Sequence, residues 1–125
     1  MKPGLSILEL CDIVRETAYA IHKYLGHGHL EKVYENALAG RLSRIGLVVQ
    51  QQYPLPVHDE DGTLLGEYFA DLWVESCLIV ELKAATCLVG EHTAQLLGYL
   101  RAADIRDGLL INFGSYRFQI RKYVL

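Results

Sequence analysis

Residues 68–83 read YFADLWVESCLIVELK, two strand-like runs that carry charge where the middle of a sheet should be apolar. Asp71 lies in the first run, and Glu81 and Lys83 close the second. Side chains alternate between the faces of a strand, so Glu81 and Lys83 emerge on one face while Leu82 points to the other. Buried charges that serve structure alone are unfavourable unless they are paired, whereas a magnesium site needs carboxylates and phosphoryl chemistry benefits from a lysine. These three charged residues are the first candidates for function.

The two runs can form one site if they are neighbouring antiparallel strands, because Asp71 then lies opposite the pair Glu81 and Lys83. Magnesium takes one or two carboxylates, several waters and a phosphate oxygen, and the backbone carbonyl of Leu82 could supply a further ligand. Lys83 would then stabilise negative charge at the phosphorus centre or orient the attacking water. The structural alternative is a partly buried salt bridge between Lys83 and one carboxylate, and spacing alone does not separate the two interpretations.

The pattern along the chain predicts three helices and five strands in an α/β arrangement. The expected helices cover 6–26, 30–46 and 90–103, and the expected strands cover 47–57, 64–74, 77–83, 109–113 and 118–124. Ser6 and Glu9 have the form of a capping box that starts the first helix. Pro54 and Pro56 indicate that the first strand is an edge strand, because proline donates no ladder hydrogen bond. The unbroken apolar start of the third strand indicates a central position. A three-layer sheet with helices on both faces accommodates this order.

Length and composition are those of an ordinary globular protein. With 125 residues, 51% hydrophobic and 22% charged, residues 1–125 are expected to form a single domain. No run reaches the roughly 18 apolar residues of a membrane span, and Glu9 and Asp12 interrupt any signal-peptide core, so we expect a cytoplasmic protein without membrane association. The three cysteines lack CxxC spacing and indicate neither a disulfide framework nor a zinc site. The net charge of −3 does not favour nucleic-acid binding, but carboxylates that hold a cation would contribute to it.

Two of the expected helices add polar residues to the candidate site. Glu31 and Glu35 fall in the early turns of the second helix, where the helix dipole favours negative charge. This explains Glu35 best, whereas Glu31 shares a face with apolar residues and could point inward. On the third helix His92, Gln95 and Tyr99 lie along one stripe, from which they could donate hydrogen bonds to phosphate oxygens or anchor a catalytic lysine. In the structural alternative Tyr99 packs in the core and the other two reach solvent.

Asp71 followed by Glu81-Leu82-Lys83 resembles the signature of the PD-(D/E)XK nuclease superfamily, whose core is a helix, three antiparallel strands, a helix and a further strand. The segment Gly28-His29-Leu30-Glu31-Lys32-Val33-Tyr34 matches the pattern for which the GxxExxY protein family, a small branch of that superfamily, is named. The resemblance covers nearly all of the chain from about Ile21 onward. It implies a three-layer, restriction-endonuclease-like core with an extra N-terminal helix and a C-terminal strand.

The resemblance also implies roles for individual residues. Asp71 and Glu81 match the metal-binding carboxylates, and Lys83 matches the catalytic lysine. Glu31 matches the helix carboxylate that some branches add to the metal site. Gln95 and Tyr99 resemble the QxxxY motif of the exonuclease branch. The implied catalytic residues are Asp71, Glu81, Lys83, Gln95 and Tyr99, and the implied metal ligands are Glu31, Asp71, Glu81 and the carbonyl of Leu82. The residue before Asp71 is Ala70 instead of proline, a position that varies widely in the superfamily.

The resulting expectation is a nuclease that uses Mg²⁺ or Mn²⁺ to hydrolyse a nucleic acid, with DNA favoured over RNA. A rival from another class is a non-catalytic nuclease fold that serves as a binding or assembly module with a partner protein, because fold does not fix function. A third possibility is the same metal chemistry on another phosphoryl substrate. The apolar stripe of the first helix is compatible with a homodimer, in which a second active site across a two-fold axis would suit a duplex.

Overall fold

The computed structural model describes residues 4–125, and their elements follow one another in the expected order. The chain runs through α1 (Ile7–Leu25), α2 (Glu31–Arg44), β1 (Val49–His58), β2 (Leu64–Val74), β3 (Leu78–Lys83), α3 (Gly90–Ala103), β4 (Asp107–Asn112) and β5 (Gln119–Val124). The strands form one sheet in the order β1-β2-β3-β4-β5. Only the β3–β4 pair is parallel among these strands, and the others are antiparallel. The α/β class is therefore confirmed, with element ends that differ from expectation by one or two residues.

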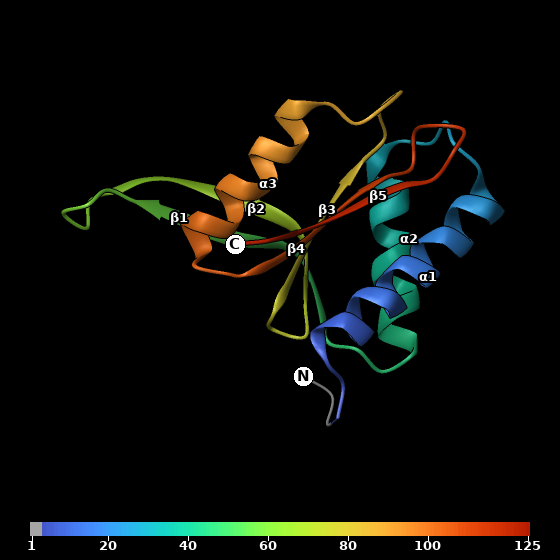
Figure 1. The fold of residues 1–125 in the computed structure, drawn as a ribbon, viewed down its shortest axis with the longest axis horizontal. Coiled ribbons are helices and arrows are strands. Elements are labelled where there is room, and N and C mark those ends of the chain that lie inside the picture. Colours follow the sequence, from blue (N-terminus) through green and yellow to red (C-terminus); the bar gives the residue numbers. More distant parts are fainter. Residues whose placement is uncertain (1–3) are drawn as a thin grey trace.

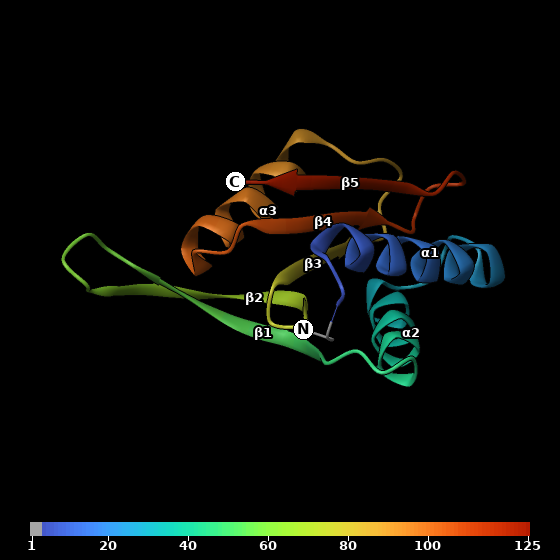
Figure 2. The same cartoon turned by 60° about the horizontal axis from the view of Figure 1, so that its bottom comes forward.

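Helices cover both faces of the sheet (Figure 1). Helices α1 and α2 share one buried cluster with the sheet, in which Val14, Leu38 and Val80 take part. Helix α3 packs on the opposite face, where Leu96 and Ile79 belong to a second cluster. In the turned view the β1–β2 hairpin extends away from the rest of the chain (Figure 2). The expected three layers are confirmed, and β3 lies at the centre of the sheet between them.

The first helix forms as the sequence predicts. Ser6 Oγ accepts a hydrogen bond from the Glu9 amide at 3.1 Å, and Glu9 Oε1 accepts one from the Ser6 amide at 3.1 Å. This reciprocal capping satisfies two amides that have no partner inside the helix. The apolar stripe of α1, which includes Leu10, Val14 and Ile21, is buried within the chain. The stripe, which was one of the grounds for expecting a homodimer, packs against this chain's own sheet.

The edges of the sheet agree with the proline pattern. Strand β1, which contains Pro54 and Pro56, has β2 as its one neighbour and is an edge strand as predicted. Five of the six residues of β3 are buried, as expected for a central strand. No helix in residues 4–125 combines the length and the apolar character that a bilayer-spanning segment needs.

The loop that leaves β3 is fixed against the end of β4. Asn112 is completely buried, and its Oδ1 accepts a hydrogen bond from the Ala85 amide while its Nδ2 donates to the Ala85 carbonyl, both at 3.0 Å. The Phe113 amide donates to the Lys83 carbonyl at 2.8 Å. The backbone of Gly114 lies so close to this loop that a Cβ would stand 2.3 Å from the carbonyl carbon of Ala84. Lys83 is therefore held in place by the strand beside it.

Replacing Gly114 with alanine should destabilise the fold, because the added Cβ collides with backbone atoms that cannot rotate away. We expect a loss of about 1–3 kcal/mol in the free energy of unfolding, measured by urea denaturation. The matched control is Gly98→Ala in α3, where a Cβ meets nothing within 4 Å. That control should be neutral or gain up to about 1 kcal/mol from helix propensity. Equal stability of the two variants would show that Gly114 does not contact the loop.

Candidate functional site

Where the backbone pairing of β2 with β3 ends, side-chain carboxylates accept hydrogen bonds from the backbone amides. The last backbone pair is Leu72 with Val80, so the next pair of positions is Asp71 and Glu81. The Asp71 amide donates to Glu81 Oε1 at 2.8 Å, and the Leu82 amide donates to Asp71 Oδ2 at 2.8 Å. Each carboxylate thus satisfies an amide of the other strand. The two acids lie opposite each other, as the sequence predicts for neighbouring antiparallel strands.

Leu82 contributes its backbone to this gap, while its side chain is buried in the core beneath α1 and α2. Its amide points at Asp71. The N–H and C=O groups of one residue leave a strand on the same edge, so the Leu82 carbonyl also faces the gap. The next carbonyl along the strand, that of Lys83, faces β4 and accepts from Phe113. The Leu82 carbonyl, which we expect from the sequence to be a ligand, therefore lies on the edge of β3 that faces Asp71.

Lys83 is directed to α3. Its Nζ donates to Gln95 Oε1 at 2.6 Å. Within residues 4–125, no lysine, arginine or histidine forms an ion pair with Asp71 or Glu81, so the salt-bridge interpretation of this charged group is wrong. Lys83 is still near enough to lower the pKa of both carboxyls by electrostatic attraction, although larger effects raise them. The lysine is consequently anchored beside the acids and is not neutralised by them.

The polar stripe of α3 divides between the site and the helix end. Tyr99 stacks on Tyr68 with ring centroids 5.0 Å apart, and its pKa is raised to about 12 by burial first and then by Glu81. His92, in the first turn of α3, instead accepts a hydrogen bond from the Val89 amide at 3.2 Å. An open hollow of about 310 Å³ adjoins this region, lined by Tyr68, Ala94, Gln95, Gly98 and Tyr99.

Three carboxyl groups influence one another at the end of the ladder. Burial is the main cause that raises the pKa of Glu81 to about 8, and the charge of Asp71 is the second. The pKa of Asp71 is raised as well, again by burial first. Glu31, the first residue of α2, has a raised pKa because of burial and then Asp71, while a hydrogen bond from the Ala84 backbone acts in the opposite direction. Glu31 therefore lies near the end of β3, although the residue itself is exposed.

Glu35 is a residue of this region that the sequence pattern assigned to the helix dipole instead. It is only 3% exposed, and its carboxylate accepts hydrogen bonds from Lys32 Nζ at 2.9 Å, Gln51 Nε2 at 2.7 Å and Gln52 Nε2 at 2.8 Å. Three donors satisfy a buried charge that would otherwise be strongly unfavourable. The available signal was its position one turn after Glu31, which places both on one helix face.

Gln52 joins this network to the carboxylate pair. Its Nε2 also donates to Asp71 Oδ1 at 3.2 Å. Its φ is +52°, a left-handed conformation that is unfavourable for a side chain other than glycine. Residues held in such conformations cluster at functional sites, where the surrounding structure enforces them.

The alternation of side chains between the two faces of the sheet is interrupted at Gln52 and Asp71. Backbone pairing on either side joins Gln51 to Leu72 and Tyr53 to Ala70, and it omits the positions between them. Leu72 packs in the core beneath α1 and α2, yet Ala70, two residues earlier, packs with α3. Regular alternation would place both on one face. The local reversal sets Asp71 between the two helical layers, within reach of groups from α2 and α3.

The donor set suits a hard divalent cation. In the part of the chain that the structure describes, no three His, Cys, Asp or Glu side chains gather into a complete metal site. Two opposed carboxylates, Asp71 and Glu81, and the Leu82 carbonyl supply oxygen atoms only, and Glu31 stands nearby. Magnesium is typically held by one or two carboxylates and completes its shell with waters and phosphate oxygens. The residues present therefore fit a cation that shares its ligands with a substrate.

Known proteins resemble this chain in sequence and in fold. Residues 8–123 match the sequence model of the PD-(D/E)XK nuclease superfamily. No curated protein matches the chain. The crystal structure of SSO0001 resembles this fold with a TM-score of 0.51 at 16% sequence identity, over 94% of this chain and 57% of that one. At this identity the likeness concerns the fold alone, and the chain spans little more than half the length of that protein.

The raised pKa of Glu81 predicts how stability depends on pH without metal. The folded chain keeps this proton up to about pH 8, whereas the unfolded chain loses it near the ordinary value of 4.5. The contribution of Glu81 is therefore fully present below the unfolded pKa and is lost as pH rises through the folded one. We expect the free energy of unfolding in EDTA to fall from pH 5 to pH 8, on the order of a few kcal/mol.

Glu81→Gln should flatten this profile, and Glu67→Gln, at an exposed position of β2, should leave it unchanged. Urea denaturation at several pH values measures both. A Glu81→Gln profile as steep as the original would contradict the assignment, and a marked loss of stability at every pH would revive a structural role for this carboxylate.

The left-handed conformation of Gln52 predicts an order of stability among variants. Gln52→Ala and Gln52→Gly both remove the bonds to Glu35 and Asp71, which should cost about 1–3 kcal/mol. Glycine adopts a positive φ without strain, so Gln52→Gly should be more stable than Gln52→Ala by about 1 kcal/mol. Thermal or urea unfolding of the pair tests this difference directly, because the lost hydrogen bonds cancel between them. Equal stabilities would argue against the positive φ.

Proposed function

The chain belongs to the PD-(D/E)XK nuclease superfamily, and from this premise we propose that it is a metal-dependent nuclease that hydrolyses phosphodiester bonds at the site formed by Asp71, Glu81 and Lys83. One observation carries the proposal. Asp71 and Glu81 oppose each other across the open end of a ladder, and each accepts a 2.8 Å hydrogen bond from a backbone amide. Beside them Lys83 donates to Gln95 and forms no ion pair within residues 4–125. DNA is the favoured substrate over RNA, and residues 1–125 would act as one catalytic domain.

Asp71 and Glu81 would hold Mg²⁺ or Mn²⁺, with the Leu82 carbonyl and Glu31 as further ligands. When bound, such an ion supplies positive charge at the phosphate oxygens and makes a bound water more acidic. The amides of Asp71 and Leu82 fix the orientation of the two carboxylates before any ion arrives. Coordination would also relieve the repulsion that contributes to their raised pKa values.

Lys83, Gln95 and Tyr99 would act on the substrate phosphate. Lys83 keeps its positive charge available because its partner is the neutral amide of Gln95. That contact limits the rotamers of a long side chain, so less freedom is lost when a phosphate binds. Tyr99 remains a neutral hydroxyl near pH 7, because its pKa is about 12, and it can donate a hydrogen bond into the hollow beside Gln95.

Three positions of the GxxExxY pattern have distinct structural tasks, which supports placing the chain in that branch. Gly28 turns the chain with a φ of +110°. Glu31 then opens α2 beside the carboxylate pair. Tyr34 is completely buried, donates to the Gly26 carbonyl at 2.6 Å and stacks on Phe113 at 4.6 Å. The pattern therefore describes a turn, a candidate ligand and the anchor that holds both.

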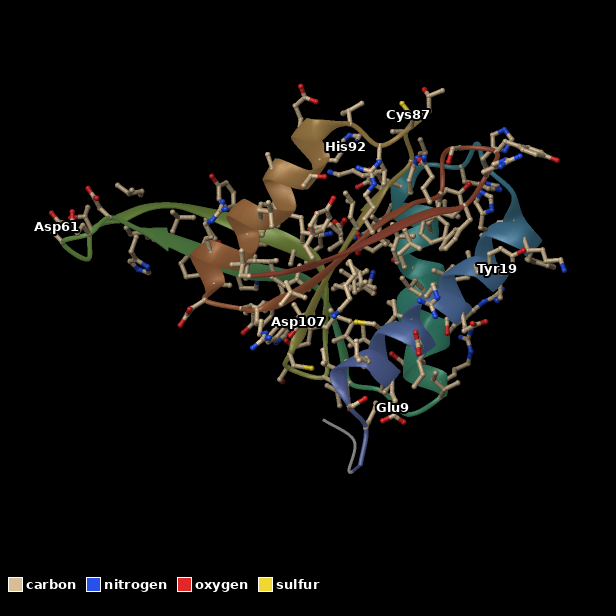
Figure 3. All side chains as sticks on the ribbon, in the orientation of Figure 1. Glu9, Tyr19, Asp61, Cys87, His92 and Asp107 are labelled. Atoms are coloured by element: carbon tan, nitrogen blue, oxygen red, sulfur yellow. The ribbon has the colours of Figure 1, made fainter. Side chains whose placement is uncertain are left out.

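The alternative function is a binding or assembly module that works with a partner protein. One observation favours it. The β1–β2 hairpin, whose tip is marked by Asp61 in Figure 3, exposes Leu64 at 61%, Leu65 at 62% and Phe69 at 48%. Exposed apolar side chains along a projecting hairpin are typical of a contact surface. Such a contact is also compatible with catalysis, so the experiment below tests the catalytic step itself.

Substitutions at the site should separate metal binding from catalysis. Asp71→Asn should abolish both the Mg²⁺ or Mn²⁺ binding seen by isothermal titration with nucleic acid present and the cleavage of labelled single- and double-stranded DNA and RNA. Lys83→Ala should keep metal binding and lose about 10²–10³-fold in cleavage rate, because it removes charge at the phosphate. Glu67→Gln, an exposed acid on β2, is the control that should change neither.

Cleavage that survives in Asp71→Asn would contradict the assignment of the site. Absence of metal binding in the original chain, even with nucleic acid present, would favour the non-catalytic module. Metal binding without cleavage of any of the four nucleic acids would direct attention to another phosphoryl substrate, for which a panel of nucleotides is the next assay.

A further inference from the structure

A groove of about 600 Å³ lies between the C-terminal end of α1 and the loop that joins β4 to β5. Figure 1 shows this loop beside the connection from α1 to α2, and Figure 3 marks Tyr19 on α1. Its lining is aromatic and basic, and none of its described residues is acidic; it comprises Tyr19, His22, Lys23, Gly26, His27, Tyr116, Arg117 and Phe118. A basic, aromatic groove stands out in a chain whose net charge is −3.

The floor of the groove is held by several contacts. His22 Nε2 lies 2.8 Å from the Ser115 carbonyl, which ties the β4–β5 loop to α1. Phe118 packs edge-on against Tyr19, with ring centroids 5.7 Å apart, and also lies 5.7 Å from the His22 ring. At the rim Tyr116 is 84% exposed, and its ring centroid lies 6.2 Å from that of His27 in a T-shaped arrangement. The groove is therefore a formed surface with one aromatic ring largely presented to solvent.

The loop that lines the groove also contacts the residue that follows β3. Gly114 packs against Ala84, which directly follows Lys83. The backbone of Ala84 also forms a hydrogen bond with Glu31. Tyr116 follows Gly114 by two residues, and His27 precedes Glu31 by four. The segments that carry Tyr116 and His27 are therefore connected through Gly114 and Glu31 to the end of β3.

We propose that this groove binds an unpaired segment of the nucleic-acid substrate, with a base stacked on Tyr116 and phosphates near Lys23 and Arg117. The inference rests on the proposed function and narrows its substrate class. Aromatic side chains stack on bases of any sequence, and cations beside them neutralise the backbone. A fully paired duplex keeps its base faces stacked inside the helix and cannot offer them to Tyr116. The substrate would therefore carry an unpaired strand next to the bond that is cut.

The first test compares two exposed tyrosines in a binding assay without metal. Fluorescence anisotropy in EDTA follows a labelled oligothymidylate and a labelled blunt duplex. Tyr116→Ala should weaken oligothymidylate binding about five- to tenfold, because one stacked base is lost, and should barely affect the duplex. Tyr24→Ala is the matched control, since Tyr24 is 80% exposed on α1 but does not line the groove. Thermal unfolding verifies that both variants fold.

The second test uses the salt dependence of the same binding. Arg117→Ala should reduce the slope of log affinity against log salt by roughly 0.7, the value for one phosphate contact on a single strand. Arg121→Ala is the control, because Arg121 lies on β5 opposite Leu110, which packs beneath α3 on the other face of the sheet. Its slope should equal that of the original chain.

The outcomes separate this inference from the proposed function. Unchanged oligothymidylate affinity in Tyr116→Ala, equal loss in Tyr24→Ala, or no oligothymidylate binding at all would overturn the groove, whether or not the chain cleaves. Weaker binding in Tyr116→Ala alone would support it. If that result occurs while metal-dependent cleavage is absent, the proposed nuclease fails and the groove stands as a single-strand binding surface.

Discussion

Two hydrogen bonds at the end of the β2–β3 ladder hold the candidate site together, one from Asp71 to Glu81 and one from Leu82 to Asp71. They occupy positions at which a continued sheet would pair backbone with backbone. The strands can separate here without leaving these amides unsatisfied, since the carboxylates serve as acceptors. The same bonds replace the hydrogen bonds that water would donate to the acids, so the acids can lie in the middle of the sheet. The same two hydrogen bonds therefore end the pairing of the strands and hold the acids in position.

Surrounding elements supply what this gap requires from several directions. Helix α2 brings Glu31 to the acids and buries Glu35 behind them, and Gln52 bridges Glu35 to Asp71. Helix α3 holds Lys83 through the hydrogen bond that the lysine donates to Gln95. None of these contacts neutralises Asp71 or Glu81, and burial raises both pKa values. A site that holds acids whose repulsion and burial are only partly offset sacrifices stability, as functional sites commonly do.

The order of elements and the opposition of Asp71 and Glu81 could be predicted because both follow from local pattern. A single hairpin connects β2 to β3, and alternation on the strands then decides which side chains meet. The contributions of Glu35 and Gln52 to the site could not be predicted, because side-chain alternation fails at Gln52. Its left-handed backbone conformation is not marked by a glycine in the sequence. Glu35 on α2 and Gln52 on β1 also meet between two layers, and no spacing along a strand reveals such a contact. Similarly, the partner of Lys83 depends on the packing of α3, and spacing alone left its salt bridge open.

The connectivity of the site has a consequence for the order in which the chain assembles. Asp71 and Glu81 stand ten residues apart in one hairpin, a short loop that closes at low entropic cost. Asn112 and Gly114, which lock the loop behind Lys83, come after the whole crossover through α3 to the parallel strand β4. Such non-local pairing is slow to form. We therefore expect the acids to come together early, while water still surrounds them, and to be buried only when β4 and α3 pack against the hairpin.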